Sequence, residues 1–221
     1  MSMTAPPFVD GLAASDARVV LSAATVRRLP ARRLIYEQGS SASDFFLLSK
    51  GRARYFSMTP DGRKMLLHWI VPGDVLGVAA LLTASSLYRV SAETVRDSSF
   101  LTWNRKTMRA LLDRYPHLSH NALAVATGYL DWYIAAHGAL VSDTARQRLA
   151  SVLACIAESI GRPLHGGLEL QVTNEELASA ANITLFTASR ILNEWQSARA
   201  LTKRRGRIIL HSPRRLFRLT A

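Results

Sequence analysis

The residues best suited by type to do chemistry are cationic and cluster late in the sequence. From Arg199 to Arg218 there are eight Lys and Arg residues and no acidic residue. Within this segment, "ALTKRRGRIILHS" predicts a hairpin with Gly206 at its tip. Ammonium and guanidinium groups on such a hairpin can bind nucleic-acid phosphates, which positions a protein without reading the base sequence.

A pair of helices is predicted directly before this hairpin, in "NEELASAANITLFTASRILNEWQSARAL", residues 174–201. Thr173 and Glu176 have the spacing of a capping box at the start of the first helix. Asn182 suits a left-handed residue at the corner, and Thr184 can cap the second helix. Helical spacing predicts a buried face of the second helix at Ala188, Ile191, Leu192 and Trp195.

The other face of the second helix is the candidate reading surface. It carries Leu185, Phe186, Ser189, Arg190 and Asn193. Leu185 and Phe186 cannot hydrogen-bond to a base edge, although they can make apolar contacts. An ordinary helical hairpin inside a core is the alternative, but a basic hairpin directly after such a pair favours nucleic-acid binding.

Short apolar runs separated by turn residues lie between Leu34 and about Asn104. They include "RLIYEQ", "DFFLLSKGRARYFSM", "KMLLHWIV" and "SFLTWN". Many short strands at regular spacing predict a small antiparallel β-roll or barrel. Residues 15–28, "SDARVVLSAATVRR", predict a short helix before it, and "KTMRALLDRYP" predicts a return to helix at about Arg105.

A long helix is predicted over residues 117–141, where small and apolar residues recur every seven positions over about three heptads. We predict a dimer seam on one face of this helix and contact with the roll on the other. A core helix packed only on the roll is the alternative. Ser142, Asp143 and Thr144 offer a break and a new N-cap. The predicted seam consists of Leu123, Thr127, Leu130, Ile134, His137 and Val141.

The composition limits the classes of protein to which the chain can belong. The chain has 221 residues, 48% of them hydrophobic, and a net charge of +12, which favours polyanionic partners. The single cysteine, Cys155, excludes a disulfide framework, a Cys-based zinc site and a four-thiolate iron–sulfur cluster, and its helical context predicts a core position. No signal peptide or membrane span is recognisable, so we expect a cytoplasmic protein with no membrane partner.

Two other classes of function fit the sequence less well. An enzyme would need a nucleophile–base pair, a metal triad or a phosphate-cradling glycine loop, and none is recognisable. We therefore expect no enzyme activity, no metal site and no cofactor. A nucleotide-binding adaptor without DNA function would not need the basic hairpin.

The sequence resembles the CRP/FNR superfamily of transcription regulators over nearly all of its length. The resemblance rests on "PGDVLG" in the predicted roll, the long helix, "ARQRLA" after it, and "TNEELASAANITLFTASRIL". It implies an α+β fold with a jelly-roll-like antiparallel β-roll of the cyclic-nucleotide-binding type (1–116), a dimerisation helix (117–141) and a winged helix-turn-helix (142–221). It also implies a bacterial, homodimeric regulator of a near-palindromic DNA operator, with RNA polymerase as a partner.

The resemblance also implies an effector pocket between roll and helix, formed by Gly77, Val78, Arg89 and Val90. Members that bind cyclic AMP have Glu directly after the glycine and an Arg-Ser pair on the next strand. Here Val78 and Val90 replace the Glu and the Ser, so ribose and phosphate oxygens would lose partners at about 1–3 kcal/mol each. We therefore expect an effector other than cyclic AMP, of unknown identity. The pocket should be lined by apolar groups from "MLLHWIV", Val78, Val90 and the long helix. It is either filled by its own side chains or takes an apolar effector. A cyclic-nucleotide sensor, or a haem sensor using His68 or His137, is the alternative.

The recognition helix also departs from the family pattern. Well-known members have Arg-Glu where this chain has Leu185 and Phe186, so we expect a different half-site, with contacts to thymine methyl groups. Arg190 keeps the family's arginine position and is the best candidate for a guanine contact. The complete predicted DNA-binding set is Asn174, Thr184, Leu185, Phe186, Thr187, Ser189, Arg190, Asn193, Lys203, Arg204, Arg205 and Arg207.

Overall fold

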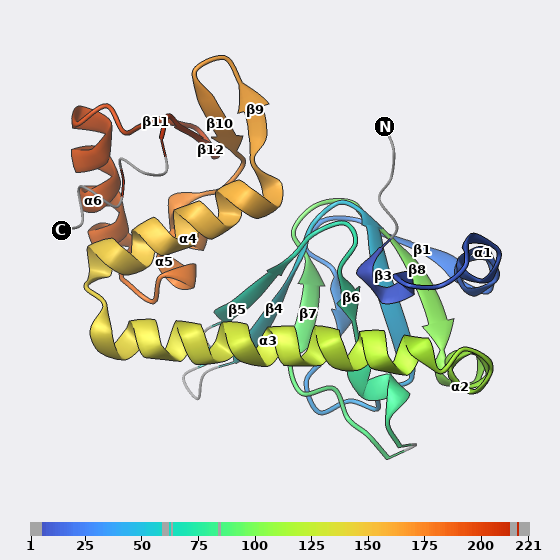
Figure 1. The fold of residues 1–221 in the computed structure, drawn as a ribbon. Helices are drawn as coiled ribbons and strands as arrows, with labels where there is room; N and C mark the ends of the chain where they lie inside the picture. The colour runs from blue at the N-terminus through green and yellow to red at the C-terminus, as the bar shows by residue number, and fades with distance from the viewer. Residues whose placement is uncertain (1–5, 59–61, 63, 84, 213–215, 217–221) are drawn as a thin grey trace. The chain divides into compact units, whose positions relative to one another are not determined.

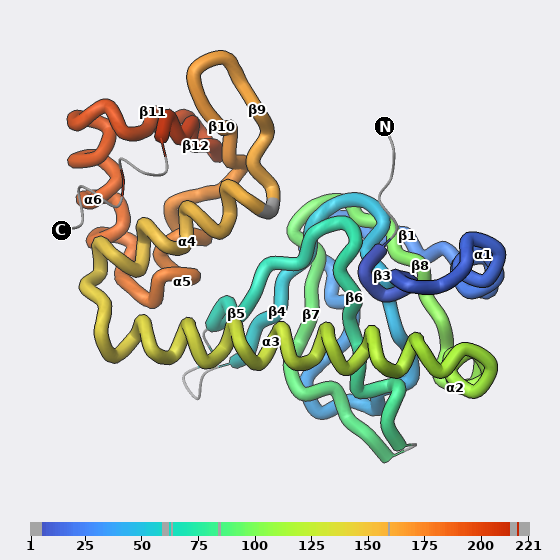
Figure 2. The backbone as a smooth tube through the Cα atoms, in the orientation of Figure 1, coloured from blue at the N-terminus to red at the C-terminus, as the bar shows by residue number. Residues whose placement is uncertain are grey.

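The computed structural model of the chain describes residues 6–58, 62, 64–83, 85–212 and 216. Figures 1 and 2 show the path of the chain through its helices and strands. The chain divides into two compact units, Met1–Trp132 and Tyr133–Ala221, and the division falls within one long helix. Each unit is described by itself.

The first unit consists of an antiparallel roll with helices before and after it. Its elements are η1 (Pro7–Val9), α1 (Ala14–Ser22), β1 (Thr25–Leu29), β2 (Leu34–Tyr36), β3 (Asp44–Lys50), β4 (Ala53–Met58), β5 (Lys64–Ile70), β6 (Val75–Leu76), η2 (Val78–Leu81), β7 (Ser91–Thr94), β8 (Ser98–Asn104), α2 (Arg105–Arg114) and the start of α3 (His117–Ser142). The strands form two four-stranded sheets in the orders β1-β8-β3-β6 and β2-β7-β4-β5, and all their pairings are antiparallel. The predicted β-roll is confirmed.

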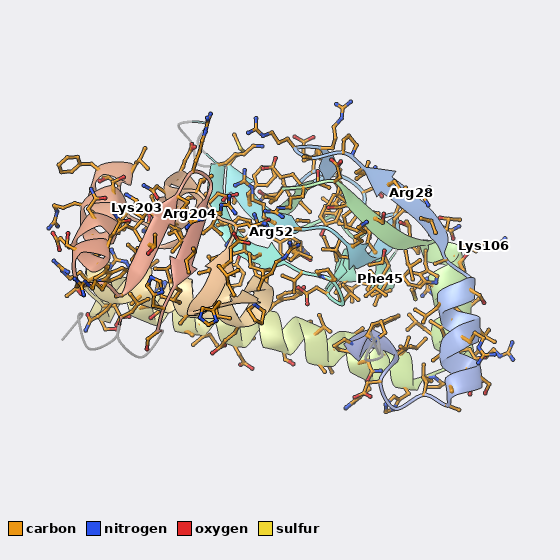
Figure 3. All side chains as sticks on the ribbon, turned by 90° about the horizontal axis from the view of Figure 1, so that it is seen from above. Arg28, Phe45, Arg52, Lys106, Lys203 and Arg204 are labelled. Carbon is orange, nitrogen blue, oxygen red and sulfur yellow. The ribbon has the colours of Figure 1, made fainter. Side chains whose placement is uncertain are left out.

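Strand β3 is buried on both faces, because its alternating side chains enter two different cores. Phe46 and Leu48 pack inside the roll. Phe45 and Leu47 point the other way, into a cluster that includes Phe8 of η1 and residues of α1, α2 and α3. Figure 3 labels Phe45 in this second cluster. The period-two alternation of a strand thus joins the roll to the helices that flank it.

One predicted element is wrong in part. The helix expected over residues 15–28 ends at Ser22, and Thr25–Leu29 forms the edge strand β1. This strand pairs with β8 from Thr25 opposite Thr102 to Leu29 opposite Ser98. The backbone hydrogen bonds that β8 offers, together with the β-branched Thr25 and Val26, favour a strand over the helical spacing that the sequence also contains.

The second unit has the plan of a winged helix-turn-helix. After the end of α3 it contains α4 (Ala145–Ile160), β9 (Arg162–Leu164), β10 (Gly167–Leu170), α5 (Asn174–Ala180), α6 (Leu185–Ser197), β11 (Leu201–Arg204) and β12 (Arg207–Leu210). The strands form one antiparallel sheet in the order β11-β12-β10-β9. The sequence "LELQVT", residues 168–173, predicts a single strand before α5. The additional strand β9 contains Pro163 and lies at the edge of the sheet, where a residue without an N–H is tolerated.

Cys155 was predicted as a core residue, and this is wrong, because its side chain is exposed on α4. The buried residues of α4 recur with helical spacing at Leu149, Ala150, Leu153, Ile156 and Ala157. Cys155 falls outside this stripe, although it lies directly before Ile156. The apolar neighbours that suggested burial therefore lie on another face of the helix.

The end of α3 and the start of α4 follow the predicted break. Helix α3 ends at Ser142, and the Thr144 side chain accepts a hydrogen bond from the backbone N–H of Gln147. The Gln147 side chain accepts one in return from the backbone N–H of Thr144, which completes a capping box. Within the described ranges, no helix is long and apolar enough to cross a membrane.

Candidate nucleic-acid interface and sensor cleft

The corner between α5 and α6 is fixed by its caps. The Thr173 Oγ1 accepts from the Glu176 backbone N–H at 3.1 Å, and a Glu176 carboxylate oxygen accepts from the Thr173 backbone N–H at 2.8 Å. Asn182 takes the left-handed conformation with φ 49°, and Thr184 caps α6 through the backbone N–H of Thr187. These contacts satisfy backbone donors at both helix starts and so define where α6 begins relative to α5.

Helix α6 separates a buried face from an exposed one. Ala188, Ile191, Leu192 and Trp195 are all buried, as the spacing predicts. On the other side the Phe186 residue is 78% exposed and Leu185 is 52% exposed. Two large apolar side chains standing in solvent beside cationic groups mark a surface suited to contact another molecule.

Arg190 lies on the exposed side of α6 and is held by an acidic neighbour. Its guanidinium donates to the Glu194 carboxylate at 2.8 Å, one helical turn further along. Arg146 of α4 donates to the other oxygen of the same carboxylate. Glu194 therefore links α4 to the candidate base-reading residue and orients its guanidinium.

The hairpin of β11 and β12 brings cations beside α6. Lys203 donates from its ammonium to the Asn193 side-chain oxygen at 2.7 Å, and its backbone N–H donates to the Gln196 side chain at 2.8 Å. Arg204 and Arg205 are exposed near the tip, and Figure 3 labels Lys203 and Arg204 there. These contacts connect the hairpin to α6 and leave positive charge at its surface.

The remaining predicted DNA-binding residues have partners within the second unit. The Asn174 amide donates to the Ser189 hydroxyl at 3.2 Å, and the hydroxyls of Thr184 and Thr187 lie 2.8 Å apart. Arg207 donates to Glu169 of β10 at 2.8 Å. This hydrogen bond holds the pKa of the Glu169 carboxyl below its ordinary value.

The four predicted effector residues have different surroundings within the first unit. Gly77 is buried and adopts φ 77°, and an added Cβ would lie 2.6 Å from the Asp44 backbone oxygen, so only glycine fits. Val78 packs against the cluster around Phe45, whereas Val90 packs against the core inside the roll. The Arg89 side chain is exposed.

A cleft of about 290 Å³ lies elsewhere on the first unit. It is formed by η1, by β5 with the turn that follows it, and by one face of α3. The residues that line it are Pro7, Phe8, His68, Gly73, Asp74, Val75, Val125, Gly128, Tyr129 and Trp132. Of the segments singled out from the sequence, "PGDVLG" contributes Gly73, Asp74 and Val75, "KMLLHWIV" contributes His68, and the central helix contributes four residues. Gly77, Val78, Arg89 and Val90 do not line the cleft.

His68 faces two aromatic rings of α3 across this cleft. Its ring centroid lies 5.4 Å from that of Tyr129 and 4.8 Å from that of Trp132, both edge to face. Burial lowers the pKa of His68 to about 4, so its imidazole is neutral at neutral pH. Tyr129 is fixed in turn, because its hydroxyl donates to the Val75 backbone oxygen at 2.9 Å.

The predicted seam is an exposed stripe on α3. Leu123, Leu130 and Ile134 are 63%, 58% and 62% exposed, and Val141 is 80% exposed. Thr127 and His137 are exposed on the same face. The residues of α3 that line the cleft, such as Val125 and Trp132, lie on the opposite face at about 100° per residue.

Several residues of these surfaces were missed by sequence reasoning. The spacing of Arg190 and Glu194 could have revealed their ion pair, because residues four apart face each other on a helix. Arg146 gave no such signal, since its partner lies 48 positions away. Phe8 in the cleft also had none, because only the folded chain brings η1 beside the "PGDVLG" turn.

Comparisons with known proteins agree with this architecture. Residues 26–115 match the cyclic nucleotide-binding domain, and residues 147–219 match the Crp-like helix-turn-helix domain. The chain is 29% identical over 192 residues to the Cyclic AMP receptor protein of Thermus thermophilus, covering 86% of each.

Solved structures share the fold. FixK2 from Bradyrhizobium japonicum aligns with a TM-score of 0.78 at 22% identity, covering 90% of this chain and 98% of that one. The c-di-GMP responsive global regulator CLP of Xanthomonas campestris aligns with a TM-score of 0.79 at 18% identity, covering 90% and 100%.

A roll of this type followed by a winged helix-turn-helix defines a DNA-binding transcription regulator. More specifically, the chain belongs to the CRP/FNR superfamily. The resemblance inferred from "PGDVLG" and from the helix-turn-helix motif is thereby confirmed.

Proposed function

We propose that the chain acts as a homodimer that pairs through α3 and places two copies of α6 on a near-palindromic operator. The observation that carries the dimer is the stripe of Leu123, Leu130, Ile134 and Val141, whose apolar side chains are exposed along the helix. Each seven-residue repeat returns to the same face, which is the pattern that a paired helix covers. Two-fold symmetry of the protein would then be matched by symmetry of the DNA.

Base reading is assigned to the exposed face of α6. Arg190 would donate to a guanine in the major groove, whereas Leu185 and Phe186 would contact thymine methyl groups. Ser189 and Asn193 lie on the same helix and would contact base edges or sugars. The support is the combination of exposed apolar and hydrogen-bonding groups on one face, opposite Trp195 and the rest of the buried stripe.

Phosphate binding is assigned to the hairpin and the helix caps. Lys203, Arg204 and Arg205 would bind the DNA backbone, as would Arg207 after exchanging its partner Glu169 for phosphate. The remaining assigned contacts are Asn174, Thr184 and Thr187. Such contacts position the protein on DNA and make its affinity depend on salt.

The effector is proposed not to be cyclic AMP. Val78 and Val90, which stand where Glu and Ser hold the nucleotide in other members, are packing partners of two different cores. Arg89 alone remains to meet a phosphate, and it is exposed. A nucleotide held there would keep unpaired polar groups, each costing about 1–3 kcal/mol.

The remaining assignments follow from membership of this class of regulator. The proposed organisation is a sensor domain (1–116), a dimerisation helix (117–141) and a DNA-binding domain (142–221). RNA polymerase is the proposed protein partner, the cytoplasm the proposed location, and regulation without enzyme activity the proposed role.

Selection of bound sequences from a random duplex library tests this function. We expect an inverted repeat whose half-sites contain a guanine for Arg190 and adjacent thymines for Leu185 and Phe186. Arg190→Ala should relax the preference at the guanine alone. Enrichment of a direct repeat, or of no sequence at all, would contradict the proposal.

A further inference from the structure

Two large apolar side chains stand in solvent at the start of α6. Leu185 and Phe186 are the first two residues of this helix and are 52% and 78% exposed. Among the described residues of α5 and α6, they are the only large hydrophobic residues that are exposed. They also stand where well-known members of the family have Arg and Glu, so the partner of this apolar pair is a property of the present chain.

The start of the helix holds the apolar pair on a fixed backbone. Thr184 precedes the pair as the N-cap, and its Oγ1 accepts from the Thr187 backbone N–H at 3.1 Å. Asn182 fixes the corner just before it, with φ 49°. Leucine and phenylalanine side chains have few rotatable bonds left to order on such a backbone, so their contact with a ligand costs little conformational entropy.

The polar neighbours of the apolar pair do not distinguish one pyrimidine from another. Ser189 lies one turn further along α6, and its hydroxyl accepts from an amide of α5 at 3.2 Å. A hydroxyl both donates and accepts, so it can bond to thymine or to cytosine. Arg190, one turn after Phe186, donates to Glu194 further along the helix at 2.8 Å. Discrimination at a pyrimidine that faces the pair therefore depends on Leu185 and Phe186.

The major groove offers the apolar pair one kind of apolar partner. Of the four ordinary bases only thymine presents an apolar group there, the methyl group on C5. A methyl group on C5 of cytosine occupies the same place on the pyrimidine ring. The apolar pair has neither donor nor acceptor, so it cannot tell the oxygen on C4 of thymine from the amino group on C4 of cytosine. It can only register whether the methyl group is present.

The charges around the apolar pair favour DNA over an apolar protein partner. The cationic hairpin of β11 and β12 is tied to α6, because Lys203 donates to Asn193 at 2.7 Å. Helix α6 has a single acidic residue, Glu194, and its two carboxylate oxygens are bound by Arg146 and Arg190. DNA supplies phosphates for the hairpin and methyl groups for the pair at once.

We propose that the apolar pair recognises the C5-methyl group of pyrimidines, so that methylation of cytosine in the half-site strengthens binding. Thymine and 5-methylcytosine offer the pair the same contact, which uracil and cytosine lack. This inference rests on the proposed function, because α6 must lie in the major groove. It goes beyond that function in making operator affinity depend on a covalent mark on DNA.

Fluorescence anisotropy with the full chain and its selected operator tests the recognition of methyl groups. Each thymine of one half-site is replaced in turn by deoxyuridine, which removes only the methyl group. At the facing position we expect a loss of about twofold to fourfold in affinity, which is the effect of burying one methyl group. With cytosine placed at that position, its methylation on C5 should raise the affinity by a similar factor.

Substitutions to alanine identify the side chains responsible. Phe186→Ala should abolish both methyl effects, because Phe186 is the more exposed of the pair, and Leu185→Ala should reduce them. Leu164→Ala is the matched control, because Leu164 is 50% exposed on β9 and lies outside α6. This control should keep both effects. Thermal unfolding checks that each variant is folded.

Three outcomes would overturn the recognition of methyl groups. They are equal affinity with and without the methyl group at every position, methyl effects that persist when both residues of the pair are alanine, and methyl effects that disappear in Leu164→Ala. A retained preference for the inverted repeat would in each case leave the proposed regulator intact. If the chain prefers no DNA sequence, the proposed function fails and the recognition of methyl groups fails with it.

Discussion

Replacement of Arg190 by alanine separates base reading from phosphate binding. In the structure Arg190 is more exposed than buried, with 55% of its side chain accessible, and its main partner is Glu194 at 2.8 Å. An exposed pair of this kind stabilises a fold by about 0.3–0.5 kcal/mol. The substitution should therefore leave the free energy of unfolding nearly unchanged, so any effect on DNA binding reports the interface.

The expected loss lies at one base pair of each half-site. A good arginine–guanine contact is worth about 1–3 kcal/mol of discrimination. At 1.4 kcal/mol for each factor of ten, this corresponds to roughly fivefold to 150-fold in relative affinity. Arg190→Ala should lose that preference and keep the preference at neighbouring positions.

Lys203→Ala is the matched comparison on the hairpin. Its ammonium would bind a phosphate, so the substitution should weaken binding to every sequence alike. It should also lower the slope of log affinity against log salt by about one. Fluorescence anisotropy with an operator and its single base-pair variants, at several salt concentrations, measures both effects.

Glu194→Gln tests how Arg190 is held. The carboxylate bridges Arg190 and Arg146, so an uncharged amide should loosen the arginine and weaken discrimination. Affinity for unrelated DNA should rise, because one negative charge near the phosphates is removed. If Arg190→Ala and Lys203→Ala instead cause the same uniform loss, Arg190 is a phosphate contact and the assignment is wrong.

Three further predictions concern the first unit and α3. Leu130→Glu should split the dimer in sedimentation experiments. Ala135→Glu should not, because Ala135 is exposed but lies away from the seam. A wild-type protein that sediments as a monomer at micromolar concentration would contradict the seam. Millimolar cyclic AMP should leave the melting temperature unchanged, and a thermal shift that Arg89→Ala abolishes would restore the nucleotide sensor. As the pH falls from about 6.5 to about 4, the unfolded chain should bind a proton at His68 that the folded chain does not, so the free energy of unfolding should fall. His68→Gln should remove this part of the loss. If the variant instead loses stability with falling pH as the wild type does, His68 is not the cause.

Much of the fold could be predicted because its signals are local. The period-two runs gave the strands of the roll, and Thr173, Asn182 and Thr184 identified the helix-turn-helix through their capping and corner positions. The errors arose where two patterns overlap. Residues 25–29 have helical spacing and also β-branched side chains, and only the partner strand β8 decides between them.

The cleft could be predicted only in part. The segments "KMLLHWIV" and "PGDVLG" and the long helix were singled out from the sequence, whereas the contribution of η1 was not, because no pattern along the chain links η1 to them. Phe8, Asp74 and Trp132 come from three segments that meet only after the roll has formed. Sequence reasoning placed the effector at Val78 and Val90 because the family motif lies there. The Val78 and Val90 side chains pack against two different cores, and the cleft beside His68 borders the "PGDVLG" turn that carries the family motif.

In the proposed interface, the second unit divides two tasks between neighbouring elements. Cations on β11 and β12 are attracted to any phosphate, so they raise affinity for all DNA equally. The exposed Leu185 and Phe186 gain nothing from phosphate and can gain only from apolar groups at the groove floor, which thymine provides and cytosine does not. Lys203 is hydrogen-bonded to Asn193 of α6, so the hairpin and the proposed reading helix are connected. In the proposed complex, the non-specific attraction of the hairpin would bring Leu185 and Phe186, at the start of α6, to the bases, where specificity would be decided.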